Sequence, residues 1–211
     1  LDNNFQVYGY SRTNSIVHKN FTFIQADLSD TDSVNRIKLP QANASSSVIL
    51  INNAATIGKI SPINQKSNND ILYEYNLNLI TPVLLSKKVI DNYIQNNKLI
   101  INISSGAAIK AISGWATYCS SKAAMDSFTL SINEEKHDNL RAISIYPGIV
   151  NTKMQENIRK ASSECFPLLN KFKDYFTKNE LAEPRTVAKR IYEIITNSKK
   201  YSSNIIDIRN L

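Results

Sequence analysis

Six short apolar runs, rich in β-branched and aromatic residues, are spread along this chain of 211 residues. Most of them are almost continuously apolar, which is typical of strands that are buried on both faces of a parallel sheet. The six runs are FQVYGYS, FTFIQADL, VILINNAA, KLIINISS, RAISIYPG and NIIDI. This pattern restricts the chain to folds in which helices cover both faces of the sheet.

Helical patterns lie between the apolar runs, at about 69–93 and 115–136, and a third begins at Pro184. Alternating strands and helices predict an α/β fold with a doubly wound, mostly parallel sheet. The length fits a single domain over 1–211, since a domain takes about 100–200 residues. The segment QANASSSV at 41–48 is expected to be a surface loop.

The composition excludes several classes of protein. Charged residues make up 20% and apolar residues 42%, as in ordinary globular proteins. No apolar run approaches the ~20 residues that span a bilayer, and the first residues do not form a signal peptide pattern. Cys119 and Cys165 are the only cysteines, which favours a reducing cytoplasm over a disulfide framework.

The net charge of +7 does not predict nucleic-acid binding, because the basic residues are scattered and no aromatic-interleaved basic stretch occurs. Positive potential near a cleft would instead attract an anionic ligand such as a phosphorylated cofactor. His18 and His137 are far apart and have no ligand partners at metal spacing, so no metal site is predicted.

Small or polar residues lie at the C-terminal ends of five of the six runs, and ligands bind at such strand ends in open α/β sheets. They are SRT, Asp27, NNAA, SSGAA and PGIVNT. Each alone is explained by turn chemistry. Their joint position predicts a cleft at the carboxyl edge of the sheet.

Tyr118 and Lys122 stand four residues apart in a helical pattern, so they share one face of the helix. A phenol has a pKa of about 10, and a nearby cation stabilises the phenolate and lowers that pKa. The spacing therefore predicts a proton donor, although a bare pair of this kind is more often part of an ordinary amphipathic helix. Ser104 and Ser105 end a strand upstream, and alternation lets only one of them face the site.

The chain resembles the short-chain dehydrogenase/reductase family over nearly its whole length. The resemblance rests on NNAA at 52–55, Asn78, Ser105, Tyr118 with Lys122, and YPGIVNT at 146–152, in family order and spacing. Within the family, it is most similar to the branch of the sepiapterin and benzil reductases.

The resemblance implies a Rossmann-like fold and a catalytic set of Asn78, Ser105, Tyr118 and Lys122. Tyr118 would donate the proton, Lys122 would tune it and bond the nicotinamide ribose, and Ser105 would hold the substrate oxygen. Asn78 would hold a water that relays protons to the lysine. The spacing in the family selects Ser105 over Ser104 and Asn78 over Asn76. The alternative for Ser105 is a serine that only forms a turn at the strand end, and the alternative for Asn78 is a helical asparagine that faces solvent.

Arg12 follows Ser11 where cofactors without a 2′-phosphate usually meet an acidic residue. A guanidinium suits phosphate, so NADP(H) is favoured over NAD(H), the alternative being a surface arginine. The resemblance assigns further cofactor contacts to the adenine border, the ribose strip and the nicotinamide loop. These are Asp27 and Leu28; Asn53, Ala54 and Ala55; and Pro147, Gly148, Val150 and Thr152.

One departure from the family concerns the first strand and its glycine-rich turn, on which the cofactor pyrophosphate rests. The five glycines of the chain form no such turn ahead of a helix, and LDNNFQ leads directly into what would be the second strand. We expect that the given sequence lacks an N-terminal segment rather than being a degenerate family member. A sheet without that strand would leave backbone groups unpaired.

The sequence thus predicts an NADPH-dependent reductase of small ketones or vicinal dicarbonyls. Alternatives are a non-catalytic NADP-binding sensor or scaffold and a 3-ketoacyl-carrier ketoreductase with a basic docking patch. The segment 153–184 corresponds in place to the substrate-covering segment of the family and carries no readable motif. Trp115 and Tyr146 are expected in the substrate pocket or the core, and Cys119 as a packed thiol. Family members pair through helices that start near Asn69 and Trp115, so a homodimer is expected.

Overall fold

Two parallel sheets form the centre of the computed structural model, which describes residues 5–211. One sheet pairs β1 (Val7–Ser11) with β2 (Phe21–Gln25). The other has the order β3 (Ser47–Asn52), β4 (Asn97–Ile103), β5 (Leu140–Tyr146) and β6 (Ile205–Asp207). All six runs that the sequence predicts to be strands are therefore confirmed.

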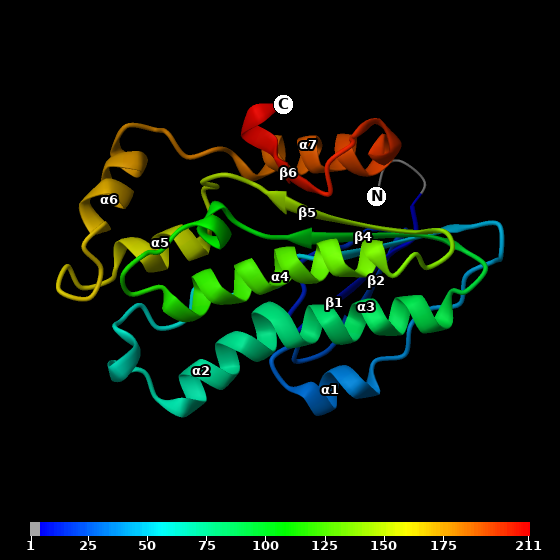
Figure 1. The fold of residues 1–211 in the computed structure, drawn as a ribbon, viewed down its shortest axis with the longest axis horizontal. Helices are drawn as coiled ribbons and strands as arrows, with labels where there is room; N and C mark the ends of the chain where they lie inside the picture. Colours follow the sequence, from blue (N-terminus) through cyan, green and yellow to red (C-terminus); the bar gives the residue numbers. More distant parts are fainter. Residues whose placement is uncertain (1–4) are drawn as a thin grey trace.

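Helices cover both faces of the larger sheet, with α3 and α4 on one side and α7 on the other (Figure 1). The α-helices are α1 (Thr31–Arg36), α2 (Asn68–Tyr75), α3 (Thr81–Asn92), α4 (Ala116–Glu134), α5 (Lys153–Arg159), α6 (Leu169–Thr177) and α7 (Pro184–Thr196). Ile100 and Ala142 pack towards α3 and α4, while Ile101 and Ile143 pack towards α7. Since successive strand residues face opposite sides, this double cover explains why the strands are almost continuously apolar.

The sheet is interrupted between β1 and β3. In residues 5–211 no strand pairs with the second edge of either one. Tyr10 of β1 and Leu50 of β3 nevertheless pack around the same buried cluster, which includes Val34. The observed fold is thus the expected parallel sheet with helices on both faces, without the strand and glycine-rich turn that the family places first.

The helical pattern predicted over 69–93 is divided into three parts. A capping box between Ser67 and Asp70 starts α2, and a π-helical turn, η2 (Asn76–Ile80), joins it to α3. Such turns carry an extra residue per turn and often occur at functional sites. The turn contains Asn78, so the irregularity lies at a predicted catalytic residue.

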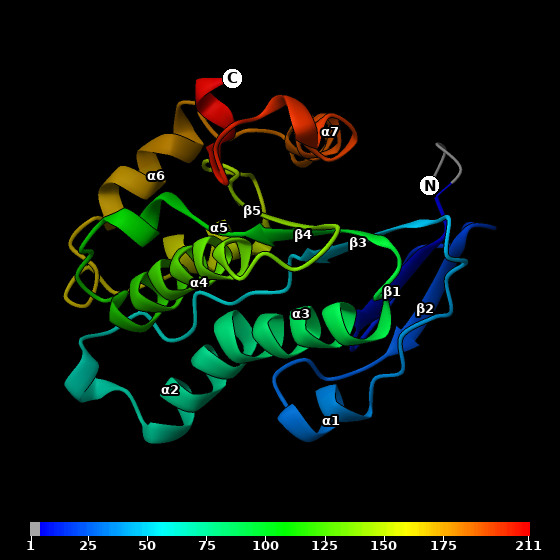
Figure 2. The ribbon, with the colours of Figure 1, turned by 45° about the vertical axis from the view of Figure 1, so that its right-hand side comes forward.

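The segment 153–184 folds into α5 and α6 beyond the end of β5 and packs on the start of α4 (Figure 2). Phe166, Leu169 and Phe172 are buried there together with Trp115 and Tyr118. The segment therefore covers the side of the helix that carries the predicted proton donor. No helix of residues 5–211 has the length and apolar character needed to cross a bilayer.

Candidate active site

A turn at a glycine sets the direction in which α4 begins. Gly114 has φ +81°, a conformation that L side chains rarely adopt, and a Cβ there would lie 2.5 Å from the carbonyl oxygen of Cys165. Only glycine fits both conditions. Two residues later α4 begins, and it carries Tyr118 and Lys122 towards the carboxyl end of β4.

Ser105 faces the phenol of Tyr118. Its hydroxyl accepts a hydrogen bond from the amide of Ala107 at 3.1 Å and interacts with the Tyr118 side chain. Ser104 is buried and turned the other way, with its hydroxyl 3.5 Å from the carbonyl of Lys122. Ser105 is thus both a strand-end serine turn and the neighbour of the phenol, and its catalytic role stays a prediction.

Lys122 is buried beside this pair. Its Nζ donates to the carbonyl of Ile103 at 2.7 Å and lies 5.8 Å from the centre of the Tyr118 ring. Burial lowers the pKa of Lys122 to about 8, because the ammonium form loses its hydration, while the charge of Asp126 opposes that shift.

The pKa of Tyr118 is raised, whereas the sequence predicts a lowered one. Burial is the largest cause, the hydrogen bond with Ser105 lowers the pKa, and Cys119 raises it slightly further. Tyr118 is only 7% exposed, so the phenolate loses most of its hydration. The predicted net direction is wrong because this loss outweighs the favourable contacts.

Asn78 is buried in the π-helical turn and holds the loop after β3. Its Oδ1 accepts from the amide of Thr56 at 2.8 Å, and its Nδ2 donates to the carbonyl of Thr56 at 2.9 Å. A weaker contact of 3.4 Å reaches Ser121 on α4. The alternative of a solvent-facing asparagine is wrong, since Asn78 is 1% exposed; Asn76 is only half-buried.

The predicted ribose strip lies next to the predicted catalytic residues. Asn53 and Ala54 are exposed after β3, and Ala54 lies beside Asn78 and Lys122. A lysine has three donors, and Lys122 gives one to Ile103. Small side chains beside a buried amine with donors to spare fit the ribose and nicotinamide end of a dinucleotide.

The predicted nicotinamide loop follows β5. Pro147, Gly148 and Val150 are half-buried, and Thr152 is exposed as the N-cap of α5. Gly148 has φ +75°, which favours glycine at this turn. The loop therefore begins at the same sheet edge as Ser105.

The predicted adenine end lies at the carboxyl ends of β1 and β2. Arg12 is exposed and close enough to Asp27 for its charge to help lower the pKa of that carboxyl, after the larger effect of hydrogen bonds from Ser29. Ser11 donates to the carbonyl of Thr13 at 2.6 Å, and Leu28 accepts through its carbonyl from Thr81 at 2.7 Å. Residues 5–211 contain no glycine-rich turn that could cradle a pyrophosphate.

An aromatic cluster that the sequence does not predict closes over the phenol. Trp115 stacks on Phe166 with ring centres 5.1 Å apart, and meets Tyr118 edge-on at 5.6 Å. Phe172 lies 5.3 Å from Trp115. The aromatic residues of 162–184 were a visible signal, but only the tertiary fold brings them to α4.

A buried ion pair beside the first turn of α4 is also not predicted by the sequence. Lys66 Nζ donates to the two carboxylate oxygens of Glu74 at 2.7 and 2.5 Å, and to the hydroxyl of Thr117 at 2.7 Å. Thr117 also donates to Glu74. Because Thr117 precedes Tyr118, this group fixes the turn that carries the predicted proton donor.

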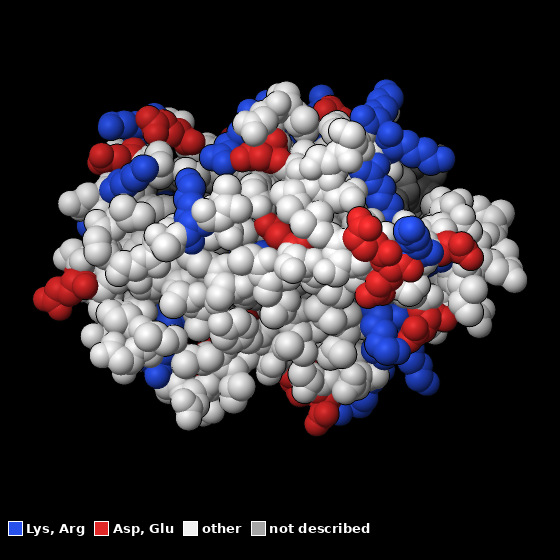
Figure 3. Space-filling model, in the orientation of Figure 1, with Lys and Arg blue, Asp and Glu red and all other residues white. Residues whose placement is uncertain are grey.

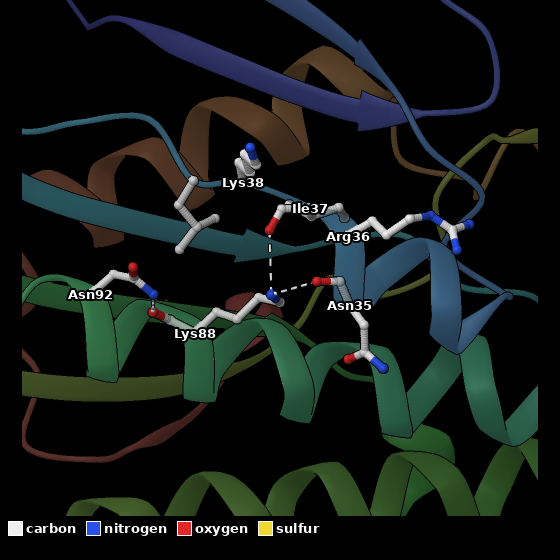
Figure 4. A pocket seen from close by; sticks show the side chains of 7 residues that line it. Asn35, Arg36, Ile37, Lys38, Lys88 and Asn92 are labelled. Carbon is white, nitrogen blue, oxygen red and sulfur yellow. Dashed lines mark hydrogen bonds between the residues drawn. The ribbon is translucent and has the colours of Figure 1, made fainter.

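A surface cavity of about 660 Å³ lies apart from this site (Figure 4). Lys88 dominates it, and its ammonium donates to the carbonyls of Asn35 and Ile37 at 3.0 and 3.3 Å. The lysine thus satisfies the end of α1, as cations do at helix C-termini. No predicted site residue lines this cavity.

The geometry defines a class of protein: a Rossmann-like domain with serine, tyrosine and lysine grouped at the carboxyl edge of a parallel sheet. The family model described as short chain dehydrogenase matches residues 9–163. The chain belongs to this family of oxidoreductases.

Relatives and solved structures agree with the assignment. A benzil reductase ((S)-benzoin forming) of Bacillus subtilis (strain 168) is 30% identical, over 99% of this chain and 90% of the relative. A sepiapterin reductase of Bos taurus is 28% identical, over 80% of this chain and 64% of the relative. A 4-hydroxyisoleucine dehydrogenase complexed with NADH has the same fold, with a TM-score of 0.78 and 23% identity over 98% of this chain and 88% of that one.

Proposed function

We propose that the protein is an NADPH-dependent carbonyl reductase of small ketones or vicinal dicarbonyls. The observation that carries the proposal is the pairing of the Ser105 and Tyr118 hydroxyls beside the buried amine of Lys122. The benzil and sepiapterin reductases among the relatives support a carbonyl substrate.

A nicotinamide cofactor, when bound, would supply the hydride that reduces the carbonyl carbon. Ser105 donates a hydrogen bond to the substrate oxygen and holds it next to Tyr118. Tyr118 stays protonated until it is needed, because burial raises its pKa, and it then gives its proton to that oxygen. The Lys122 ammonium stabilises the phenolate that remains, and Asn78 supports the return of a proton through the lysine.

The choice of NADPH rests on Arg12. Its guanidinium lies on the exposed end of β1 and suits a 2′-phosphate, with Ser11 beside it. Asp27 and Leu28 border the adenine. Asn53, Ala54 and Ala55 support the ribose, and Pro147, Gly148, Val150 and Thr152 meet the carboxamide end. The two free thiols suit a reducing cytoplasm.

The test follows NADPH oxidation at the nicotinamide absorbance band, with benzil and with smaller vicinal diketones. The protein should oxidise NADPH only when a dicarbonyl is present. Tyr118→Phe should lower the turnover by about 10²–10⁴-fold, the usual contribution of a general acid, and should leave NADPH binding measurable by calorimetry. Turnover that is unchanged in Tyr118→Phe would reject the assigned acid.

A non-catalytic sensor or scaffold is the second candidate, and the missing glycine-rich turn in residues 5–211 favours it. That candidate predicts NADPH binding without oxidation by any carbonyl. Reduction of carrier-bound 3-ketoacyl groups in preference to diketones would instead identify a ketoreductase.

A further inference from the structure

Asp126 is a buried carboxylate on the catalytic helix for which the proposed mechanism has no role. It is 6% exposed. One oxygen accepts a hydrogen bond from the Tyr146 hydroxyl, and the other has no hydrogen-bond partner in the described residues. A buried carboxylate with an unmatched oxygen is costly, so its presence here needs an explanation.

Its position on α4 supplies one. Tyr118, Lys122 and Asp126 follow at intervals of four residues, and all three are buried on one face of the helix. Lys122 makes no ion pair within 4.0 Å in residues 5–211, and its amine donates only to the carbonyl of Ile103. Along α4, Lys122 therefore stands between a tyrosine and an aspartate that are each one helical turn away.

We propose that Asp126 is a positioning residue whose fixed negative charge keeps Lys122 protonated beside Tyr118, with Tyr146 holding the carboxylate in place. The effect on catalysis rests on the proposed function, whereas the effect on the protonation of Lys122 does not.

The charges around the amine agree with this role. Burial lowers the pKa of Lys122 to about 8, and Asp126 is the group that raises it. The phenols of Tyr118 on α4 and Tyr146 on β5 have raised pKa values, for which burial is the largest cause, and both are neutral near pH 7. The Cys119 thiol on α4 is neutral as well, since burial raises its pKa.

One further anion faces this group from β6. The charge of Asp207 acts on Tyr146, but Asp207 is paired with Arg209, whose Nε lies 2.8 Å from a carboxylate oxygen. Its charge is thereby largely balanced. Asp126 remains the unbalanced anion of the group.

A structural role would give a different pattern of variants. Asp126→Asn keeps the size of the side chain and an acceptor for Tyr146, but removes the charge. Tyr146→Phe removes the hydrogen bond and keeps the charge. The two substitutions therefore separate charge from packing.

The experiment titrates the lysine directly. The protein is labelled with [ε-¹³C]lysine, its NMR signals are followed from pH 6 to 11, and the Lys122 signal is assigned through its loss in Lys122→Met. The wild-type pKa is expected near 8. Asp126→Asn should lower it by about one pH unit, since a close opposite charge shifts a pKa by about 1–3 units. Asp126→Glu should restore most of the loss, and Tyr146→Phe should shift the pKa by clearly less than Asp126→Asn.

An unchanged Lys122 pKa in Asp126→Asn would overturn the proposal, as would an equal shift in Tyr146→Phe. If Asp126→Asn does not fold, as judged by circular dichroism, Asp126→Ser removes the same charge and replaces it in the titration.

The consequence for catalysis is measured separately. The alkaline limb of kcat/KM for dicarbonyl reduction should move to lower pH in Asp126→Asn, by the same interval as the NMR pKa. A limb that stays in place while the NMR pKa moves would refute the catalytic part. A wild-type protein without reductase activity would refute the proposed function alone, because the NMR titration still decides the role of Asp126.

Discussion

Burial decides the behaviour of single residues in this site. It raises the pKa of Tyr118 and lowers that of Lys122, so both side chains favour their neutral forms. A neutral phenol is the form that can donate a proton. The lysine, with a pKa of about 8, is then the group whose protonation changes just above neutral pH.

The pH dependence of the protein's stability should reflect the lowered pKa of Lys122. Its pKa falls from 10.5 to about 8 on folding, so between those values the unfolded chain binds the additional proton and the free energy of unfolding rises with pH. The difference of 2.5 pH units corresponds to about 3 kcal/mol, at about 1.36 kcal/mol per unit.

Urea unfolding at pH 7.5, 9 and 10.5 measures the effect, with Lys122→Met as the reference because other groups titrate in the same range. As the pH rises, the free energy of unfolding of the wild type should increase relative to that of Lys122→Met. Parallel curves for the two proteins would contradict the buried, proton-losing lysine.

The ion pair of Lys66 and Glu74 gives a second prediction at this scale. Both side chains are 1% exposed, so removal of either partner leaves a buried charge without a counter-charge. Lys66→Met and Glu74→Gln should each cost about 3–5 kcal/mol, and the double variant should cost less than the sum. Chemical denaturation of the four proteins measures this coupling; additive losses would show that the pair does not act as a unit.

Among the elements, the helix pair α5 and α6 depends on aromatic contacts for its place over α4. Phe172 packs against Trp115 and Phe166, while Phe176 on the same helix is 49% exposed and stacks on Arg159. The two phenylalanines are therefore a matched pair, one facing α4 and one facing solvent.

Phe172→Leu should loosen the segment 153–184, and Phe176→Leu should not. The loss of buried contacts should cost roughly 1–2 kcal/mol, which raises the population of molecules with this segment open by about tenfold. Limited proteolysis detects that rise as faster cleavage within the segment. The KM for benzil should rise in Phe172→Leu alone. Equal cleavage rates in both variants would show that the cluster does not hold the helices down.

The π-helical turn is a second feature at the element scale. It joins α2 to α3 without a break in the helix and turns Asn78 inwards to the backbone of Thr56. The loop that carries Asn53 to Ala55 is thereby tied to the helix that precedes α3. The helix irregularity and the predicted cofactor strip are therefore held together by these hydrogen bonds.

On the scale of the whole molecule, one face carries few charges. Lysine, arginine and the acidic residues lie mainly around its rim, and the middle, where α2, α3 and α4 face the viewer, is mostly uncharged (Figure 3). Leu72 of α2 and Leu130 of α4 are 59% and 45% exposed. The homodimer expected from the sequence would cover these helices.

Leu72→Lys combined with Leu130→Lys should convert such a dimer to monomers, because a buried ammonium without a partner is costly at an interface. Size-exclusion chromatography with light scattering measures the mass, and Ile94→Lys, at an exposed position after α3, is the control. A wild type that is already monomeric would reject the expected dimer.

The sequence alone determined what depends on neighbours along the chain. Continuous apolar runs fixed the six strands, and the four-residue spacing placed Tyr118 and Lys122 on one helix face. It also identified Ser105 as a residue at the end of a strand. The missing glycine-rich turn predicted unpaired strand edges, which correspond to the interruption between β1 and β3.

Only the tertiary structure decided what depends on burial and on contacts between distant segments. Four features of the site depend on such contacts. They are the direction in which the pKa of Tyr118 shifts, the hydrogen bond of Thr117 to Glu74, the stacking of Phe166 on Trp115, and the hydrogen bond of Tyr146 to Asp126. No periodicity encodes them, because their partners lie far apart in the chain. Their energies arise from the removal of water, which happens only once the helices close on the sheet.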